Sequence, residues 1–395
     1  MARGRVRTAD VAPDVAGPRL VLLVAVFGLT LLGFVMIFSA SSISAITEGD
    51  QTSYLFDQLV FAVLGVASAF VLWKVIPYQL WATRLIWVVW GIAVALLLLT
   101  AVMGIAALGA QRWLVLGPIS LQPSEFAKIA IVLMAAYQFS NLRAGFSDVR
   151  QFIVSLIVCV ILPTMFLYVT QSDLGTTMII AVGVLAVMWL GEVPLRVVVI
   201  TIGALALFAV FAVVLSSYRS DRFLFIDPWN DGEGGRGNGY QLVHSYYAIA
   251  EGGIFGVGLG NSREKYLYLP ESETDFIFSI ICEELGMVGA LLVIAVFLVV
   301  LWAGLRIARA ASTDFGAMMA GSLIVMLVFQ AFLNIGCAIG VFPTTGKPLP
   351  FISSGGSSLI ASFMMVGLIL SVSEGSSRQA IAERRRDDLR VIHRA

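Results

Sequence analysis

Long apolar segments constrain the fold of this chain more than any other feature. Hydrophobic residues make up 59% of the sequence and charged residues 13%, and the mean hydropathy is +0.93. In a bilayer the backbone must satisfy its hydrogen bonds internally, so each crossing segment is expected to be a helix. The sequence therefore predicts an all-α polytopic membrane protein with about ten transmembrane helices. The expected helices are 19–42, 55–73, 85–105, 123–140, 151–170, 173–190, 195–217, 275–304, 315–340 and 352–373.

The positions of lysine and arginine predict which helix ends face the cytoplasm. If the N-terminus is cytoplasmic, seventeen of the 25 Lys and Arg residues lie inside and eight outside, as the positive-inside rule requires. The chain then divides into a cytoplasmic N-terminal segment (1–18), a single ten-helix membrane domain (19–375) and a cytoplasmic C-terminal tail (376–395). Both termini are expected inside the cell.

A long polar loop, residues 218–274, is expected on the extracytoplasmic side. Its DGEGGRGNG stretch (231–239) predicts a flexible turn. The helical spacing of apolar residues from Tyr240 to Ala250 predicts a short amphipathic helix in the membrane interface. The glycines of 252–260 lack the GxGxxG spacing of a dinucleotide site, so they predict tight turns and close helix approach.

Cysteine and histidine usage argues against a disulfide framework and against a histidine-built metal site. Cys159, Cys282 and Cys337 all lie in apolar segments, which favours packed thiols. His244 and His393 are the only histidines in the sequence, too few for the usual histidine sites.

Asp275 is the most informative acidic residue, because it begins the helix expected at 275–304. Glu283 and Glu284 follow about 12 to 13 Å deeper, at 1.5 Å per residue. Carboxylates at such depths are costly, which makes them functional candidates. Structural interpretations compete with this one. Asp275 would be a first-turn acid favoured by the helix dipole, and the glutamates would form an intramembrane salt bridge or a helix-packing hydrogen bond.

Polar residues before the fourth expected helix fall on the same predicted side as Asp275. Arg112 and Trp113 lie in the preceding loop, and Gln122 directly precedes the proline that opens the helix. Glu125 and Lys128 are one turn apart within it. They form either a local ion pair or part of a functional site.

Two further stretches join this side of the membrane. Asp173, in the QSDLGT stretch, is either a helix N-cap or a site residue. The proline-rich stretch 342–358 predicts a rigid extended loop. Ser353 and Ser354 within it would offer hydroxyl and N–H groups to an anion, or would simply cap a helix.

Together these stretches predict a site for an anionic ligand beside a carboxylate. The cations expected around Asp275 are Arg112, Lys128, Arg222, Lys265 and Lys347. Cations suit a leaving diphosphate and a carboxylate suits an incoming hydroxyl, which fits transfer from a lipid-linked diphosphate donor. On this view Lys128→Ala and Arg222→Ala would weaken activity without loss of folded protein.

The same stretches resemble the SEDS family (shape, elongation, division and sporulation). The resemblance covers Gly33 to Glu374. It rests on QRWLVLGPISLQPSEFAK, QSDLGT, DPW followed by GYQL, LPESETDFIF with EELG, and PTTGKPLPFISSGGSS. The NIGCAIGVFPTTG wording is closer to the FtsW members than to the RodA members.

The resemblance implies a peptidoglycan glycosyltransferase in the bacterial cytoplasmic membrane. Such an enzyme polymerises lipid II into glycan strands on the outer face and releases undecaprenyl diphosphate, here during cell division. The implied partners are a class B penicillin-binding protein, which is the transpeptidase, and other divisome proteins.

The resemblance also implies roles for individual residues. Asp275 falls on the family's essential aspartate and is expected to deprotonate the acceptor hydroxyl, while residues of the RW, SEFAK and ISSGG motifs line the cleft. Glu273 stands where many members have histidine. Its added charge would raise the pKa of Asp275 or help to hold a divalent cation, Mg²⁺ or Mn²⁺.

Two other functions compete with polymerisation. A flippase for a lipid-linked sugar fits the helix number and the buried charges, but the polar residues cluster on one face and no inverted repeat is evident. A non-catalytic divisome scaffold would leave the intramembrane acids unexplained.

Overall fold

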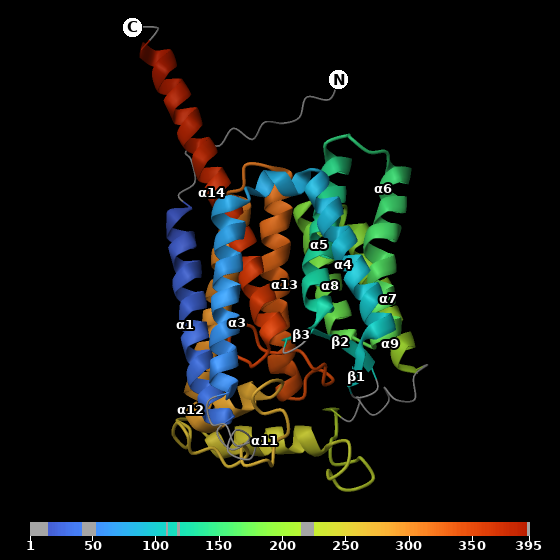
Figure 1. Ribbon diagram of the computed structural model, residues 1–395, viewed down its shortest axis with the longest axis vertical. Coiled ribbons are helices and arrows are strands. Elements are labelled where there is room, and N and C mark those ends of the chain that lie inside the picture. Colours follow the sequence, from blue (N-terminus) through green and yellow to red (C-terminus); the bar gives the residue numbers. More distant parts are fainter. Residues whose placement is uncertain (1–14, 42–52, 108–109, 117–118, 215–224, 393–395) are drawn as a thin grey trace.

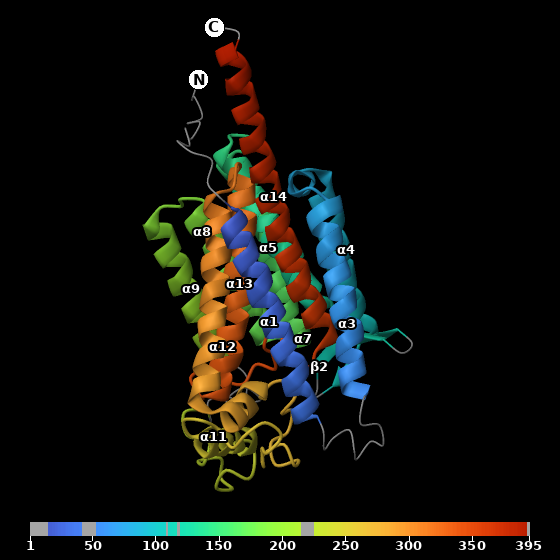
Figure 2. The same cartoon turned by 90° about the vertical axis from the view of Figure 1, so that its left-hand side faces the viewer.

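The computed structural model describes residues 15–41, 53–107, 110–116, 119–214 and 225–392. Long helices run side by side along the long axis of the molecule (Figures 1 and 2). Each of the ten expected segments contains a helix over most of its described length, which confirms the predicted class. The helix expected from Asp275 begins at Ile277, so Asp275 does not lie on its first turn as expected. The bundle helices are α1 (Ala16–Ala40), α3 (Ser53–Phe70), α4 (Arg84–Met103), α5 (Pro123–Arg143), α6 (Val149–Leu156), α7 (Leu162–Gln171), α8 (Leu174–Leu190), α9 (Leu195–Val214), α12 (Ile277–Arg309), α13 (Asp314–Ala338) and α14 (Gly356–Ile392).

Short irregular turns connect some of these helices. A π-helical turn, η3 (Ile157–Ile161), joins α6 and α7 into one membrane segment, and another, η1 (Val71–Val75), extends α3. A 3-10 turn, η2 (Tyr78–Ala82), leads into α4. Seven of the described segments are long and apolar enough to cross a membrane, and α8 and α9 are shorter apolar helices.

The centre of the bundle is built from α13, α14 and α5. In the most apolar stretch of α13, 78% of residues are buried, against 22% in α4. Because α13 packs against α5, α8, α12 and α14, it is the helix around which the others gather. Polar groups on α13 are therefore shielded from lipid and can contact several elements at once.

A small antiparallel sheet between α4 and α5 departs from the all-α expectation. Its strands are β1 (Ile105–Ala107), β2 (Ala110–Leu116) and β3 (Ile119–Leu121), in the order β1-β2-β3. Leu114 pairs with Leu121 across β2 and β3. This segment follows the end of α4, where a helix no longer satisfies the backbone, so its N–H and C=O groups pair with one another.

The last helix is longer than expected. Its predicted end was residue 373, yet α14 continues to Ile392 and projects beyond the bundle (Figure 1). The sequence after Gly375 contains neither glycine nor proline and includes six Arg and three Ala, which favour helix. Most of the polar tail at 376–395 is therefore helical rather than irregular.

The opposite end of the bundle carries α11 (Tyr240–Gly252), which lies across the helix ends (Figure 1). It buries Leu242, Val243 and Ala248 and packs against α12. The short amphipathic helix predicted from the sequence is thus confirmed. We call this end of the molecule the α11 end.

The DGEGGRGNG stretch before α11 forms the predicted turn, which is organised around one carboxylate. Asp231 accepts hydrogen bonds of 2.8 to 3.2 Å from the backbone N–H groups of Glu233, Gly235, Gly237 and Gly239. These amides, with that of Gly235 contributing most, hold the pKa of Asp231 at about 2.

The glycine-rich loop after α11 is bound to a break in α12. Gly286 has φ 68° inside the helix, and the freed backbone there pairs with the loop, as in Met287 N–H to Gly253 O at 2.9 Å. A Cβ on Gly286 would lie 2.3 Å from the nitrogen of Gly256, so the close contact requires glycine. The prediction of tight turns and close helix approach is confirmed.

Candidate functional site

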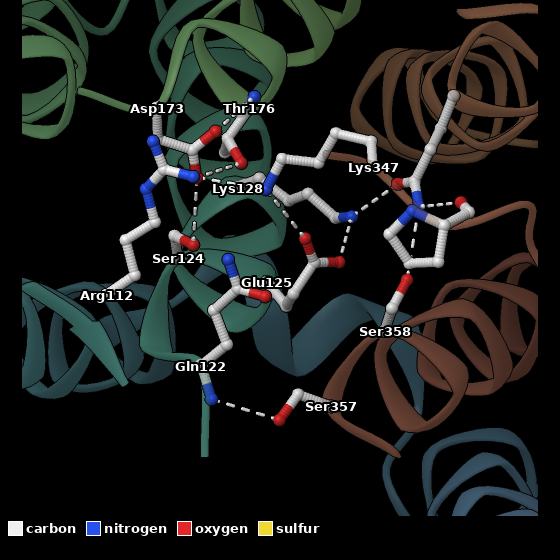
Figure 3. A network of polar contacts seen from close by, with 12 residues as sticks. Arg112, Gln122, Ser124, Glu125, Lys128, Asp173, Thr176, Lys347, Ser357 and Ser358 are labelled. Atoms are coloured by element: carbon white, nitrogen blue, oxygen red, sulfur yellow. Dashed lines mark hydrogen bonds and ion pairs between the residues drawn. The ribbon is translucent and has the colours of Figure 1, made fainter. Parts of the chain in front are cut away.

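Four buried charged side chains form one network toward the α11 end (Figure 3). We call Glu125, Lys128, Asp173 and Lys347 the buried-charge network. Lys128 Nζ lies 2.5 Å from Glu125 Oε2, while Lys347 Nζ lies 3.3 Å from Glu125 Oε1 and 2.9 Å from Asp173 Oδ2. None of the four is more than 2% exposed. The network joins α5, the start of α8 and the loop between α13 and α14.

The network is electrically balanced, with two carboxylates and two ammonium groups. Burial acts against ionisation, but Lys347 and Arg112 together with hydrogen bonding lower the pKa of Asp173 to about 2. The carboxylate also accepts the N–H of Thr176 at 3.0 Å, which confirms the predicted N-cap of α8. The ion pair predicted for Glu125 and Lys128 is likewise present.

Arg112 and Trp113 lie on β2, beside the hinge between α7 and α8. Both side chains are partly exposed. The Arg112 guanidinium donates to the backbone carbonyls of Gln171, at 2.8 Å, and Ser172, at 3.0 Å. Among the described residues no carboxylate lies within ion-pair distance of Arg112, so its charge acts on its neighbours only through the electrostatic field.

Asp275 precedes the first residue of α12 and is partly exposed. Its backbone is held at both ends: its N–H donates to Glu271 O at 3.1 Å and its carbonyl accepts from Asn334 Nδ2 at 2.8 Å. Within the described part of the chain, its carboxylate makes no hydrogen bond. Burial, aided by Glu271 and opposed by Lys347 and Arg112, raises the pKa of Asp275 to about 6.

The Ser353 hydroxyl and the Ser354 N–H support the Asp275 segment, while the anion cradle stays a prediction. Ser353 Oγ donates to Thr274 O at 2.5 Å and accepts the Leu349 N–H at 2.8 Å. The Ser354 N–H donates to Glu273 O at 2.9 Å. Because these groups already have partners within the protein, they fix the loop.

Lys265 belongs to a different cluster, so the expectation that it joins the cations around Asp275 was wrong. Its ammonium contacts Gly260 O at 2.6 Å, Ser39 Oγ at 3.1 Å and Glu284 Oε1 at 3.2 Å. Glu283 accepts the Ser262 hydroxyl at 2.6 Å. Both intramembrane glutamates therefore hold the glycine-rich loop against α12, as their structural interpretation required.

Two other predicted site residues are Gln122, which packs between helices, and Arg222. Gln122 is buried, and its backbone N–H donates to Ser357 Oγ at 3.0 Å, which links α5 to α14. Arg222 lies outside the described residues, so its expected contact with diphosphate stays a prediction. The three cysteines are free and buried, as predicted.

Sequence reasoning missed two amides on α13, Gln330 and Asn334. Gln330 Oε1 accepts from Lys128 Nζ at 2.6 Å, and Asn334 contacts the backbone of both Asp275 and Lys347. The available signal was their position in an otherwise apolar segment, where buried amides need partners. Ser124, from the SEFAK motif, donates to Asp173 at 3.3 Å, a contact that the sequence did not indicate.

Among the described residues, no three or more His, Cys, Asp or Glu side chains lie close enough to hold a metal ion. Glu273 accepts the hydroxyl of Ser272 at 3.1 Å. The described residues therefore do not form a protein-only metal site.

Among the described residues the Asp275 carboxylate makes no hydrogen bond, and it lies beside a closed network of buried charges at one end of a bundle of apolar helices. Such a carboxylate is typical of a catalytic site, so the fold and the site define a polytopic membrane protein with a candidate active site. Residues 19–378 match the cell cycle protein family of FtsW, RodA and SpoVE. The chain belongs to this family, which is the SEDS family predicted from the sequence.

Individual relatives agree with this assignment. Stage V sporulation protein E of Bacillus subtilis (strain 168) is 36% identical over 364 residues, which are 91% of this chain and 98% of that protein. The probable peptidoglycan glycosyltransferase FtsW of Trichlorobacter lovleyi is 38% identical over 370 residues, 90% of this chain and 93% of that one. Several further relatives also carry the name FtsW, which supports the predicted resemblance to FtsW members.

Solved structures share the fold. A peptidoglycan synthase complex, studied for the coordination of polymerization and crosslinking, contains a chain with a TM-score of 0.71 and 29% identity, covering 90% of this chain and 97% of that one. The rod shape determining protein RodA of Thermus thermophilus gives a TM-score of 0.65 at 28% identity, covering 89% of this chain and 95% of that one.

Proposed function

We propose that this protein is a peptidoglycan glycosyltransferase that polymerises lipid II during cell division and releases undecaprenyl diphosphate. Relatives that match nearly the whole chain carry the name of this activity. The single observation that carries the chemical proposal is Asp275, a partly exposed carboxylate without a hydrogen-bond partner in the described part of the chain.

Asp275 is the general base of the proposed reaction. Its carboxylate takes the proton from the acceptor sugar hydroxyl as that oxygen bonds to the anomeric carbon of the donor. The bond from this carbon to the diphosphate oxygen breaks, and the diphosphate leaves with the electron pair. One base suffices for a single displacement with inversion, since no glycosyl–enzyme intermediate forms. A pKa of about 6 leaves the base ionised at neutral pH and still able to accept a proton.

The leaving diphosphate needs positive charge, and Arg112 is the first candidate to supply it. It is partly exposed, lies next to Trp113 and contacts only backbone carbonyls among the described residues. Lys128 and Lys347 are already neutralised by Glu125 and Asp173. In this proposal they hold the wall of the site and act on the substrate only through their field.

The orientation and the partner are part of the same proposal. The α11 end faces outward, which leaves both termini in the cytoplasm and puts Asp275 on the side where lipid II would be polymerised. A class B penicillin-binding protein is the proposed transpeptidase partner. The structural likeness to a chain of a complex that couples polymerization with crosslinking supports this pairing.

The decisive test is glycan synthesis by the purified protein, with its class B partner and lipid II as substrate. We expect glycan strands from the wild type and none above background from Asp275→Asn. Equal strands from both would remove Asp275 from the mechanism. If neither variant makes strands, transport of lipid II into sealed vesicles should be measured next, and a positive result there would favour the flippase.

Two side measurements address orientation and metal. A single cysteine placed at Glu271, in a chain whose three buried cysteines are replaced, should react with a membrane-impermeant reagent added outside whole cells. Reaction only after lysis would overturn the proposed orientation. Chelation followed by Mg²⁺ or Mn²⁺ addition tests whether a cation held jointly by protein and diphosphate is needed, and unchanged activity in chelator would discard that idea.

A further inference from the structure

Gln330 and Asn334 are amide side chains on successive turns of α13, and both face the site. Residues four apart lie on the same side of a helix. Both are buried, at 0% and 1% exposure, in the helix around which the bundle gathers. A buried amide in an apolar helix is costly unless it is hydrogen-bonded. The partners of these amides therefore indicate what they hold in place.

Asn334 joins two segments that are far apart in the sequence. Its Nδ2 donates two hydrogen bonds of 2.8 Å, one to the carbonyl of Asp275 and one to the carbonyl of Lys347. The α12 backbone does not compete for the first carbonyl, because the N–H of Ser279 bonds to Phe276 instead. One NH₂ group thus sets the position of the proposed base relative to a lysine of the buried-charge network.

Gln330 uses both the NH₂ donor and the oxygen acceptor of its amide, whereas Asn334 uses only its donor among the described residues. Gln330 donates to Pro348 O and Ser358 Oγ, at 3.0 and 3.1 Å, and accepts from Lys128, so donor and acceptor are both used. Asn334 Oδ1 is buried and has no partner among the described residues. An unpartnered acceptor lowers stability, so stability alone does not account for an amide at 334.

We propose that Asn334 is a positioning residue for the glycosyl transfer proposed above, holding Asp275 at a fixed distance from Lys347. The inference rests on that function and adds a residue that never touches the substrate. The charged groups that act on the Asp275 carboxylate are Glu271 from its own segment, Lys347 from the loop after α13 and Arg112 from β2. Glu273, on the same segment, accepts the Ser272 hydroxyl. Loosening Lys347 from this arrangement removes part of the positive field.

Two substitutions of similar size test the proposal. Asn334→Leu removes both donors together with the unpartnered Oδ1, and Asn334→Asp replaces the donor group by an acceptor that repels both carbonyls. We expect kcat to fall about 10- to 100-fold, the loss that follows a displacement near 1 Å. KM for lipid II should change little. The acid limb of the pH–rate profile should move to higher pH in both variants, because the base loses the positive field of Lys347.

Matched variants separate positioning from general damage. Ser322→Ala removes a buried hydroxyl of the same helix that bonds, among the described residues, only Met319 O, and it should leave rate and pH profile unchanged. Asn334→Gln keeps the donor on a side chain one methylene longer and should show a smaller shift in the same direction.

Folded Asn334 variants with the wild-type acid limb would overturn the inference, whatever their thermal stability. Comparing the wild type with Asp275→Asn distinguishes a failure of the proposed function from a failure of the positioning role. If the wild type makes no glycan, or if Asp275→Asn is as active as the wild type, then the reaction itself is wrong. If that pair behaves as expected and only the Asn334 profile stays fixed, the positioning role alone is wrong.

Discussion

The buried-charge network and the Asp275 segment are neighbours that treat charge in opposite ways. In the network every charged group has a partner within 3.3 Å and is almost completely buried. At Asp275 the backbone N–H and C=O are both bonded, yet within the described residues the carboxylate has no hydrogen bond. The protein thus fixes the chain at Asp275 and leaves its reactive group free.

The paired charges of the network support the fold, whereas the Asp275 carboxylate is available for chemistry. Pairing offsets much of the free-energy cost of burying a charge. Removing one partner leaves the other charge buried and uncompensated. A carboxylate held without a partner is already at a disadvantage when ionised, as the raised pKa of Asp275 shows. Substitutions in the two regions should therefore damage different properties of the protein.

The largest expected effect comes from comparing Asp275→Asn with Asp173→Asn. Asp275→Asn removes the proposed base, and general bases contribute about 10²- to 10⁴-fold to rate. Its thermal midpoint in detergent at neutral pH should equal or exceed that of the wild type. The folded state disfavours ionised Asp275, so the neutral side chain removes a cost that is present above the carboxyl's ordinary pKa.

Asp173→Asn should show the reverse bias. The pKa of Asp173 is lowered to about 2, so its ionised form stabilises the fold above its ordinary pKa of 3.8, and this contribution is lost as pH falls toward 2. We expect a lower thermal midpoint and less folded protein. The comparison would break if Asp275→Asn unfolded the protein while Asp173→Asn left its stability intact.

The second effect in size concerns Glu125 and Lys128. Glu125→Gln alone leaves Lys128 buried without its ion-pair partner, which costs about 3 to 5 kcal/mol of unfolding free energy. The double variant Glu125→Gln with Lys128→Met removes both charges and should recover much of this loss. Thermal unfolding of the two single variants and the double variant measures the coupling. Equal losses in the single and double variants would show that the pair is not coupled.

The buried position of Lys128 revises an expectation from the sequence. The sequence predicts a cation that faces the substrate, so that Lys128→Ala weakens polymerisation without loss of folded protein. In the structure Lys128 is fully buried between Glu125 and Gln330. The one-turn spacing to Glu125 indicated the ion pair, but Gln330 is 202 positions away, and no local pattern reveals such a contact.

The fold was predictable to a greater extent than the site, for a physical reason. Lipid forces each apolar segment into a helix, so hydropathy located most of the ten; α5, which carries Glu125 and Lys128, is too polar to be recognised by hydropathy alone. Cation contacts depend instead on tertiary packing. Lys347 and Lys265 look alike in sequence, yet one joins Asp173 and the other joins Glu284. The family motifs pointed to Asp275, whereas Asn334 became visible only through its two carbonyl partners.

A smaller effect is expected at Ser353, which lies just before α14 and supports the Asp275 segment. Ser353→Ala removes the hydroxyl that bonds Thr274 O and the Leu349 N–H. Loss of a buried hydrogen-bonding group costs about 1 to 3 kcal/mol, so the thermal midpoint and kcat should both fall moderately. Ser371→Ala, which removes a hydroxyl bonded to Ile76 O far from this loop, is the matched control. The same kcat loss in both variants would mean that Ser353 has no special connection to Asp275.

The smallest expected effect sharpens the comparison most directly, because it changes the charge near Asp275 without touching its contacts. Glu271 is exposed, and its negative charge is the second cause, after burial, of the raised pKa of Asp275. Glu271→Gln keeps the backbone carbonyl that accepts the Asp275 N–H and removes the charge. The pKa of Asp275 then falls, so the base stays ionised at lower pH and the acid limb of the rate profile moves downward. The limb should stay above the ordinary carboxyl range, because burial is unchanged.

The shift of the acid limb in Glu271→Gln should shrink in high salt, which screens an exposed charge. Glu251→Gln removes an exposed acid paired with Arg263 and should leave the limb unmoved. A limb that moves upward in Glu271→Gln, or that moves equally in both variants, would show that the titrating base is not Asp275.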